Sequence, residues 1–218
     1  MKKSAITLLV ISLIALSGCT HDLELTNLHQ NTSAPAIPLD GSKTVGILAS
    51  DDSGQNSKYI EAIANSLRKT NNFDRVIYPY NPAYSKKTDY TVSVSVNPVY
   101  SGKISNFFVS WPGFLIWAPA IWGYGYNADL TTHIVATDNN RKKSLSTTLS
   151  NSYDFRQAEM DRTWTEIGWL EVSLIPFIGG FYMTGYDKDV TPEFIHQVSN
   201  NYGSEVSKGI IKSLQVGK

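Results

Sequence analysis

The sequence is poor in cysteine, and this scarcity excludes two kinds of covalent or metal stabilisation. Cys19 is the only cysteine among the 218 residues, so no disulfide can form within one chain. A zinc site built from cysteine pairs is excluded for the same reason. The single thiol therefore has to be explained by its position near the amino terminus.

An excess of charge of one sign is also lacking. The chain has 19 lysines and arginines against 19 aspartates and glutamates, which gives a formal net charge of +0. A domain that binds nucleic acid usually carries a clear basic excess. We therefore expect no nucleic-acid partner.

Sequence signatures of catalysis are absent as well. The chain contains no G-x-S-x-G elbow, no H-E-x-x-H motif and no Walker loop. His133 lies within a predicted strand and His196 within a predicted helix, where we expect structural roles. Asp51 and Asp52 follow a predicted strand, at the edge where α/β sheets often bind ligands, and turn or capping roles are the favoured explanation. We predict a protein that is not an enzyme and has no metal and no cofactor.

The amino terminus has the layout of an export signal. The stretch "MKKSAITLLVISLIALSGC" places Lys2 and Lys3 before an apolar run from Ala5 to Leu16, and small residues follow. The apolar run is shorter than the roughly 20 residues that a membrane-spanning helix needs. Residues 1–18 are therefore predicted to be a secretory signal peptide.

The end of this stretch resembles a bacterial lipobox, formed by Leu16, Ser17, Gly18 and Cys19. The resemblance implies that Cys19 receives a diacylglycerol, that cleavage occurs before it, and that its new amino group is acylated, for example with palmitate. Several acyl chains anchor a protein durably, since each buried methylene contributes about 0.8 kcal/mol. Thr20, in place of an aspartate, resembles the pattern of lipoproteins sent to the outer membrane. We expect a lipid-anchored outer-membrane protein that faces the periplasm.

Residues 19–42 are interpreted as a lipidated tether, because polar residues dominate and Pro35 and Pro38 disfavour a helix. A single domain is expected over residues 43–218. Its predicted fold class is α/β to α+β, with a small mixed sheet, packed helices and an apolar insertion rich in Trp, Pro and Gly.

Hydrophobic periodicity predicts the elements of this domain. Ile60, Ile63, Ala64 and Leu67 recur at helical spacing, and residues 191–215 form a second predicted helix. Alternation of apolar and polar residues over 89–98 predicts a strand with one buried face. Further strands are expected over residues 43–50, 74–80, 127–138 and 143–152.

The strand, helix and strand that open the domain, with "VGILAS" in the first strand, resemble a small α/β domain of envelope proteins. That domain occurs in the amino-terminal part of TolB, in the curli secretion lipoprotein and in lipoproteins that activate peptidoglycan synthases. The resemblance covers roughly Lys43 to Ser105 and parts of the later strands and the last helix, and it rests on the order of elements and on "VGILAS", not on a catalytic signature. The apolar insert from Phe107 and the segment Arg162–Tyr186 have no place in that pattern.

Two apolar segments, residues 104–128 and 172–186, carry no charge. Pro112 and Pro119 in the first and Pro176 in the second disfavour a simple spanning helix. Aromatic rings of the first segment are of the kind enriched at membrane interfaces, and they define a candidate interaction surface: Trp111, Trp117, Trp122, Tyr124 and Tyr126. Burial within the protomer, packing between subunits and contact with a membrane all remain open.

These observations favour a non-enzymatic binding or assembly component of the cell envelope. Its expected partners are the membrane, through the lipid anchor, and an envelope protein or further copies in a homo-oligomer. One alternative is a membrane-active or pore-forming oligomer that inserts the two apolar segments. A second alternative is an enzyme whose site is not recognised.

Overall fold

The structure is a computed structural model that describes residues 23–29, 39, 41–49, 54–83, 87–107, 123–158 and 184–216. The chain forms two compact units. Unit 1 consists of Met1–Leu28, Tyr100–Asn127 and Tyr153–Val190, and unit 2 consists of His29–Val99, Ala128–Ser152 and Thr191–Lys218.

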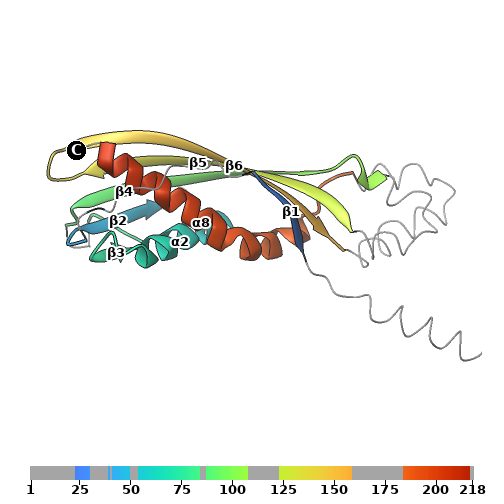
Figure 1. Ribbon diagram of the computed structural model, residues 1–218, viewed down its shortest axis with the longest axis horizontal. Coiled ribbons are helices and arrows are strands. Elements are labelled where there is room, and N and C mark those ends of the chain that lie inside the picture. Colours follow the sequence, from blue (N-terminus) through green and yellow to red (C-terminus); the bar gives the residue numbers. More distant parts are fainter. Residues whose placement is uncertain are drawn as a thin grey trace, which may run out of the picture. The chain divides into compact units, whose positions relative to one another are not determined.

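Six described strands form one sheet in the order β1-β6-β5-β4-β2-β3 (Figure 1). Their bounds are β1 Glu24–His29, β2 Thr44–Ala49, β3 Arg75–Ile77, β4 Tyr90–Gly102, β5 Tyr124–Asp138 and β6 Lys143–Gln157. The described helices are α2 Asn56–Lys69, the 3₁₀ helix η2 Lys188–Val190 and α8 Thr191–Val216. β4, β5 and β6 each contribute residues to both units, so the two units share their strands. The expectation of a single domain over residues 43–218 stays a prediction.

The sheet is mixed. β2 pairs in parallel with both neighbours, so that Val45 lies opposite Val76 of β3 and Tyr90 of β4. β5 and β6 are joined by a turn of only four residues, which an antiparallel pair alone allows. The hydrogen bond between His133 Nδ1 and Thr148 Oγ1, at 3.0 Å, joins opposite positions of this hairpin. A mixed sheet with packed helices confirms the predicted fold class, as an α+β fold.

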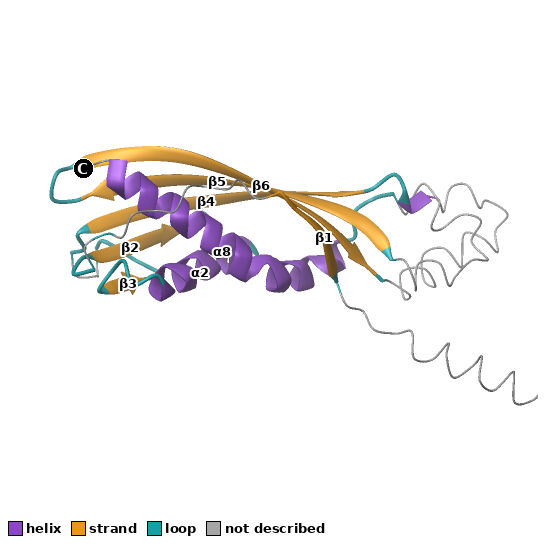
Figure 2. Cartoon of the chain, viewed as in Figure 1, coloured by secondary structure: helices purple, strands orange, loops and turns teal. Residues whose placement is uncertain are grey.

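In unit 2, α2 and α8 pack against each other and cover one face of the strands (Figure 2). The predicted apolar face of α2 is confirmed, since its four residues are at most 1% exposed: Ile60, Ile63, Ala64 and Leu67. The alternation along β4 is confirmed in the same way. Tyr90, Val92, Val94 and Val96 are buried, and the residues between them are partly exposed.

Helix α8 continues through Gly203, because the neighbouring side chains hold it against α2 and the sheet. The ring of Tyr202 meets that of Tyr59 edge to face, with centroids 5.2 Å apart. The Tyr202 hydroxyl also shares a buried hydrogen bond of 2.6 Å with the Thr132 hydroxyl on β5. A buried polar pair of this kind is satisfied only when helix and strand keep their positions.

Asp89 ties together the starts of β2 and β4 and the β5–β6 turn. Its carboxylate accepts hydrogen bonds from the backbone N–H of Thr44 at 2.9 Å and from the Thr44 hydroxyl at 3.0 Å. Asn140 Nδ2 and Lys43 Nζ donate to its other oxygen, each at 3.4 Å. The Thr44 N–H, followed by these side chains, lowers the pKa of Asp89, although partial burial raises it.

Replacing Asp89 with asparagine should lower the free energy of unfolding by about 1 kcal/mol near neutral pH, because charge-assisted hydrogen bonds are about twice as strong as neutral ones. A carboxylate with a lowered folded-state pKa stabilises the fold above its unfolded pKa of about 3.9, and this contribution is lost as the pH falls through the folded-state pKa. The gap between parent and Asp89→Asn should therefore shrink below about pH 4.

Urea unfolding at a series of pH values measures that gap, and Asp129→Asn, at an exposed position on β5, controls for the loss of one charge. A gap that stays constant down to the lowest pH at which the parent folds would contradict the role of the Asp89 carboxylate.

The expected tether contains a strand. Glu24–His29 form β1, next to β6 in the sheet, and Leu23 before it is only 4% exposed. Leu23 and Leu25 alternate with Asp22 and Glu24, a short pattern that suffices for an edge strand once β6 supplies the hydrogen-bonding partner. The structure therefore differs here from a tether that runs over all of 19–42.

Among the residues that the structure describes, no helix is long and apolar enough to cross a membrane.

Candidate functional site

The candidate site lies in unit 1, at the end of β4, the start of β5 and the end of β6. Lys103 and Asn106 follow β4, Gly123 precedes β5, and Phe155 and Arg156 belong to β6. These segments are far apart in the sequence, and contacts between them hold them together in unit 1.

The buried side chain of Asn106 joins the segment after β4 to the start of β5. It is 1% exposed, its Nδ2 donates to the carbonyl of Gly125 at 2.9 Å, and its Oδ1 accepts from the N–H of Gly125 at 2.7 Å. The N–H of Lys103 also donates to the Gly125 carbonyl, at 3.0 Å. The amide thus occupies the place of a strand neighbour and leaves neither polar group of Gly125 unpaired.

Gly123 brings the start of β5 onto the end of β6. Its φ is +64°, in the left-handed region that glycine adopts at no steric cost. A Cβ at this position would lie 2.6 Å from the carbonyl oxygen of Gln157. The close approach of the two backbones therefore requires glycine here.

Four aromatic rings pack together, one from each of β4, β5 and β6 and one from the segment before η2: Tyr100, Tyr126, Phe155 and Tyr186. The Tyr186 ring stacks on Tyr100 with centroids 4.8 Å apart, and it meets Tyr126 edge to face at 5.3 Å. Tyr126 also contacts Phe155, at 5.4 Å. We call these four residues the aromatic cluster. Aromatic pairs in such geometries each contribute about 0.5–1.5 kcal/mol beyond the burial of their area.

An open hollow of about 440 Å³ lies beside the aromatic cluster. Its lining combines small, polar and basic residues: Thr26, Lys103, Ser105, Asn106, Gly123, Gly125, Phe155 and Arg156. Lys103 Nζ forms an ion pair of 2.8 Å with Asp154 Oδ1. Arg156 is exposed. The hollow therefore presents cationic and hydrogen-bonding groups together.

Ile104 stands next to two residues of this hollow, Lys103 and Ser105. It is 79% exposed, the highest value among the exposed large hydrophobic residues that the structure describes. Ile104 and the basic side chains of Lys103 and Arg156 therefore lie close together on unit 1.

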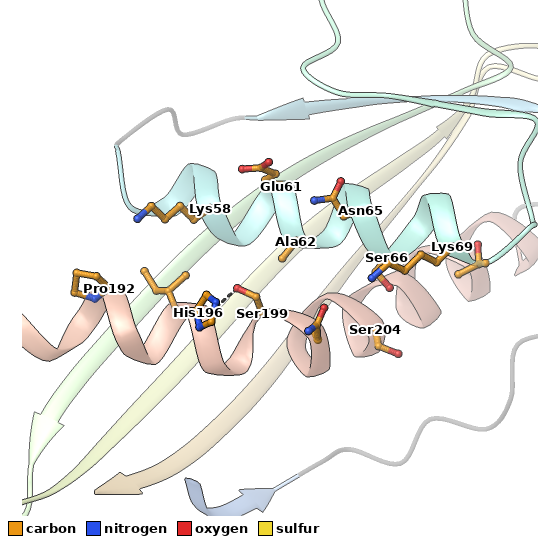
Figure 3. Close-up of a pocket in the computed structure, with 13 residues that line it drawn as sticks. Lys58, Glu61, Ala62, Asn65, Ser66, Lys69, Pro192, His196, Ser199 and Ser204 are labelled. Carbon is orange, nitrogen blue, oxygen red and sulfur yellow. Dashed lines mark hydrogen bonds between the residues drawn. The ribbon is translucent and has the colours of Figure 1, made fainter. Parts of the chain in front are cut away.

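A second depression lies in unit 2, between α2 and α8, and measures about 790 Å³ (Figure 3). Lys58, Glu61 and Lys69 line it from α2, and His196 from α8. Within the described part of the chain, none of these four side chains makes a hydrogen bond or an ion pair. The dashed line in Figure 3 marks the Ser199 hydroxyl donating to the carbonyl of Ile195. This groove holds no oriented acid–base pair of the kind that general acid–base catalysis uses.

The prediction that Tyr124 and Tyr126 belong to an exposed interaction surface is wrong. Tyr124 and Tyr126 are both 0% exposed. They alternate with Gly125 and Asn127 along β5, so that their rings point to the same buried side as Ala128 and Leu130. They belong to the core of unit 1.

The other residues predicted to act as sites lie outside the described residues: Cys19, Trp111, Trp117 and Trp122. Asp51 and Asp52 lie outside them too. His133 is exposed on β5 and contacts Thr148, and His196 is exposed on α8. In the ranges that the structure describes, no group of three or more His, Cys, Asp or Glu side chains could hold a metal ion.

Sequence reasoning missed Lys103 and Asn106, and it interpreted the charged stretch that contains Asp154 and Arg156 as a solvated face. No motif marks them, because their partners are fixed by the register of β4, β5 and β6 and not by local spacing. The burial of Tyr124 and Tyr126, in contrast, had a usable signal. The alternation along "YGYNADL" extends the predicted strand of residues 127–138 back to Tyr124.

Comparisons with known proteins leave the function to be argued from the chain itself. No protein-family model matches the chain, and no curated protein matches it. Solved structures that are similar include a PelC dodecamer from Paraburkholderia phytofirmans, with 10% identity, a TM-score of 0.28 and coverage of 77% of this chain and 100% of that one.

A minor lipoprotein from Acinetobacter baumannii shares 14% identity at a TM-score of 0.31, over 75% of this chain and 95% of that one. A hypothetical protein from Chlamydia trachomatis shares 11% identity at a TM-score of 0.37, over 78% and 98%. The resemblance to the TolB type of domain stays a prediction.

Proposed function

We propose that this chain is a lipid-anchored protein of a bacterial outer membrane that faces the periplasm and acts as a non-enzymatic binding or assembly component of the envelope. The observation that carries the proposal is the lipobox, with Cys19 as the only cysteine of the chain. Lipidation gives this thiol a function that disulfide formation within the chain cannot give. Thr20 supports delivery to the outer membrane.

The position of β1 supports a close attachment. Only three residues lie between Cys19 and the buried Leu23, and the four residue steps from Cys19 to Leu23 span at most about 14 Å in an extended chain. A lipid on Cys19 would therefore hold Leu23 within about 14 Å of the bilayer surface. With β1 beginning at Glu24, the proposed anchor would leave little room for this strand to move away from the membrane.

A binding role is supported by the two depressions described above. The hollow of unit 1 presents the basic side chains of Lys103 and Arg156, and the groove of unit 2 presents polar side chains with no oriented acid and base. Such surfaces suit contact with another envelope component better than chemistry at a reacting bond. An envelope protein or a further copy of the chain is the proposed protein partner.

Replacement of Cys19 by serine should abolish incorporation of labelled palmitate and leave an uncleaved precursor. As a matched variant, Thr20→Asp should keep the label but shift the protein from the outer to the inner membrane, because the lipidated cysteine is intact and only the sorting residue changes. Palmitate labelling followed by separation of the two membranes measures both effects.

Normal labelling of Cys19→Ser would overturn the lipid anchor. An unchanged outer-membrane location of Thr20→Asp, with labelling intact, would overturn the sorting argument alone.

A second candidate, a membrane-active oligomer, is favoured by one observation, the 79% exposure of Ile104 at the edge of the first apolar segment. Release of a trapped dye from liposomes by the purified chain distinguishes the two functions. We expect no release beyond that caused by a lipoprotein of similar size, and rapid release would favour the membrane-active oligomer.

A further inference from the structure

The hollow of unit 1 is lined by Lys103 and Arg156 and by Thr26 of β1, the described strand nearest to Cys19 in the sequence. The exposed Ile104 lies beside it. We infer that this hollow and Ile104 lie on the phospholipid surface in which the anchor is embedded. Ile104 enters the boundary between headgroups and acyl chains, and Arg156 faces the phosphates. The inference rests on the proposed lipidation of Cys19 and names the surface that the anchored protein presents to the membrane.

The exposure of Ile104 is the first observation. Its side chain is 79% exposed, although it directly follows Lys103, which is held by the ion pair with Asp154 and by the backbone bond to Gly125. Because its neighbour is fixed, the position of Ile104 is set by the fold. Ile104 directly follows Lys103, and Lys103 and Arg156 line the hollow beside it, so that one apolar and two basic side chains lie together, a combination that proteins of the membrane interface also use.

The charge of the hollow is the second observation. Asp154 offsets Lys103 through their 2.8 Å ion pair, which leaves the charge of Arg156 uncompensated. Within the ranges that the structure describes, the Arg156 guanidinium makes no ion pair and no hydrogen bond. A guanidinium is planar and carries several donors, which matches the oxygens of a phosphate. The hollow thus carries one available cation for an anionic headgroup.

Chain length is the third observation. Thr26 of β1 lines the same hollow and comes seven residues after Cys19. Seven residues of extended chain span at most about 25 Å. The acyl chains on Cys19 therefore keep the hollow near the bilayer at all times, and the surface has a very high effective concentration of headgroups.

The experiment uses the full lipidated chain reconstituted in liposomes, with Ile104→Cys as the only free thiol, because the sulfur of a lipidated Cys19 is blocked. An environment-sensitive fluorophore is attached at position 104, and nitroxide-bearing lipids serve as quenchers. Val216→Cys is the matched control, since it is a second exposed apolar position, 69% exposed, in unit 2. We expect several-fold stronger quenching at position 104 than at position 216.

The contribution of Arg156 is tested in the same liposomes. Arg156→Gln should reduce the ratio of membrane-docked to undocked label by about fivefold in anionic liposomes, which corresponds to about 1 kcal/mol per basic residue, and much less in zwitterionic ones. Arg75→Gln, at an exposed arginine of unit 2, should leave the ratio unchanged. Equal losses for both arginines would show a general charge effect and overturn the role of Arg156.

Each failure has its own signature. Two fluorophores per chain together with no palmitate would mean that Cys19 is free, which overturns the proposed function. The other outcome is one fluorophore per chain, which means that Cys19 is blocked. If the label at position 104 is then quenched by aqueous iodide and not by the nitroxide-bearing lipids, this inference alone is overturned. A label shielded from both quenchers in native membranes would identify a protein partner on this face and would overturn the inference too.

Discussion

Replacing Phe155 with alanine should lower the free energy of unfolding by about 3–5 kcal/mol, the cost of removing a large aromatic side chain from a packed core. Phe155 is 1% exposed and contacts the rings of Tyr126 and Tyr186, at centroid distances of 5.4 and 6.5 Å. The cavity left by the ring would adjoin the hollow of unit 1. Both neighbouring tyrosines would then lose packing at once.

Phe155→Leu is the matched variant, because leucine keeps most of the apolar volume and hydrophobic exchanges of similar size usually cost less than about 1.5 kcal/mol. Chemical denaturation followed by tyrosine fluorescence compares the two. If Phe155→Ala unfolds at the same denaturant concentration as Phe155→Leu, the aromatic cluster does not stabilise unit 1.

The same substitution connects stability to the membrane surface. The aromatic cluster holds Tyr186, and the bonds of Asn106 hold Gly125, beside the hollow that we place on the lipid. Loss of the Phe155 ring should therefore weaken the docking of Ile104 as well as the fold. Phe155→Leu should keep both, which ties the two readouts to one packed cluster.

Local patterns predicted most of the described elements. The helical spacing of Ile60, Ile63 and Leu67 and the alternation of Val92 and Val94 each need only the residues of one element, because burial of one face imposes the period. For that reason α2, β4 and α8 were predicted from the sequence and are found in the structure.

Features that depend on partners far away in the chain were not predicted. β1 is a short edge strand whose pattern is too brief to stand out, and it is a strand because β6 lies beside it. Asn106 forms hydrogen bonds with Gly125, and Lys103 forms an ion pair with Asp154. The partners are far apart in the sequence, so a local sequence pattern cannot predict these contacts. The candidate site is built from such contacts, so that its architecture required the fold.

Burial of Tyr124 and Tyr126 shows how composition misleads. Their segment is aromatic, uncharged and interrupted by glycine, which resembles an exposed interface. Their alternation along β5, however, places both rings in the core. The period of a sequence pattern is here a better guide to burial than the residue types within it.

Replacing Gly203 with alanine should destabilise the chain by about 1–3 kcal/mol, even though alanine is favoured over glycine in a helix by about 1 kcal/mol. A Cβ at Gly203 would lie 2.6 Å from the carbonyl oxygen of Ala62 in α2. Because backbone atoms of a packed helix cannot rotate away, the whole helix pair would have to separate. The absence of a side chain at this position is what lets α8 approach α2 so closely.

Gly209 provides the matched control within the same helix. A Cβ there would lie 2.6 Å from Cδ1 of Leu149, which is the end of a flexible side chain and can move to another rotamer. Gly209→Ala should therefore gain part of the roughly 1 kcal/mol by which alanine is favoured over glycine in a helix, and its melting temperature should stay the same or rise. The melting temperature of Gly203→Ala should fall. Thermal melting of the two variants under identical conditions tests this contrast directly. Equal melting temperatures would mean that α8 can shift along or away from α2 at little cost, and the packing of the two helices would then not be fixed by Gly203.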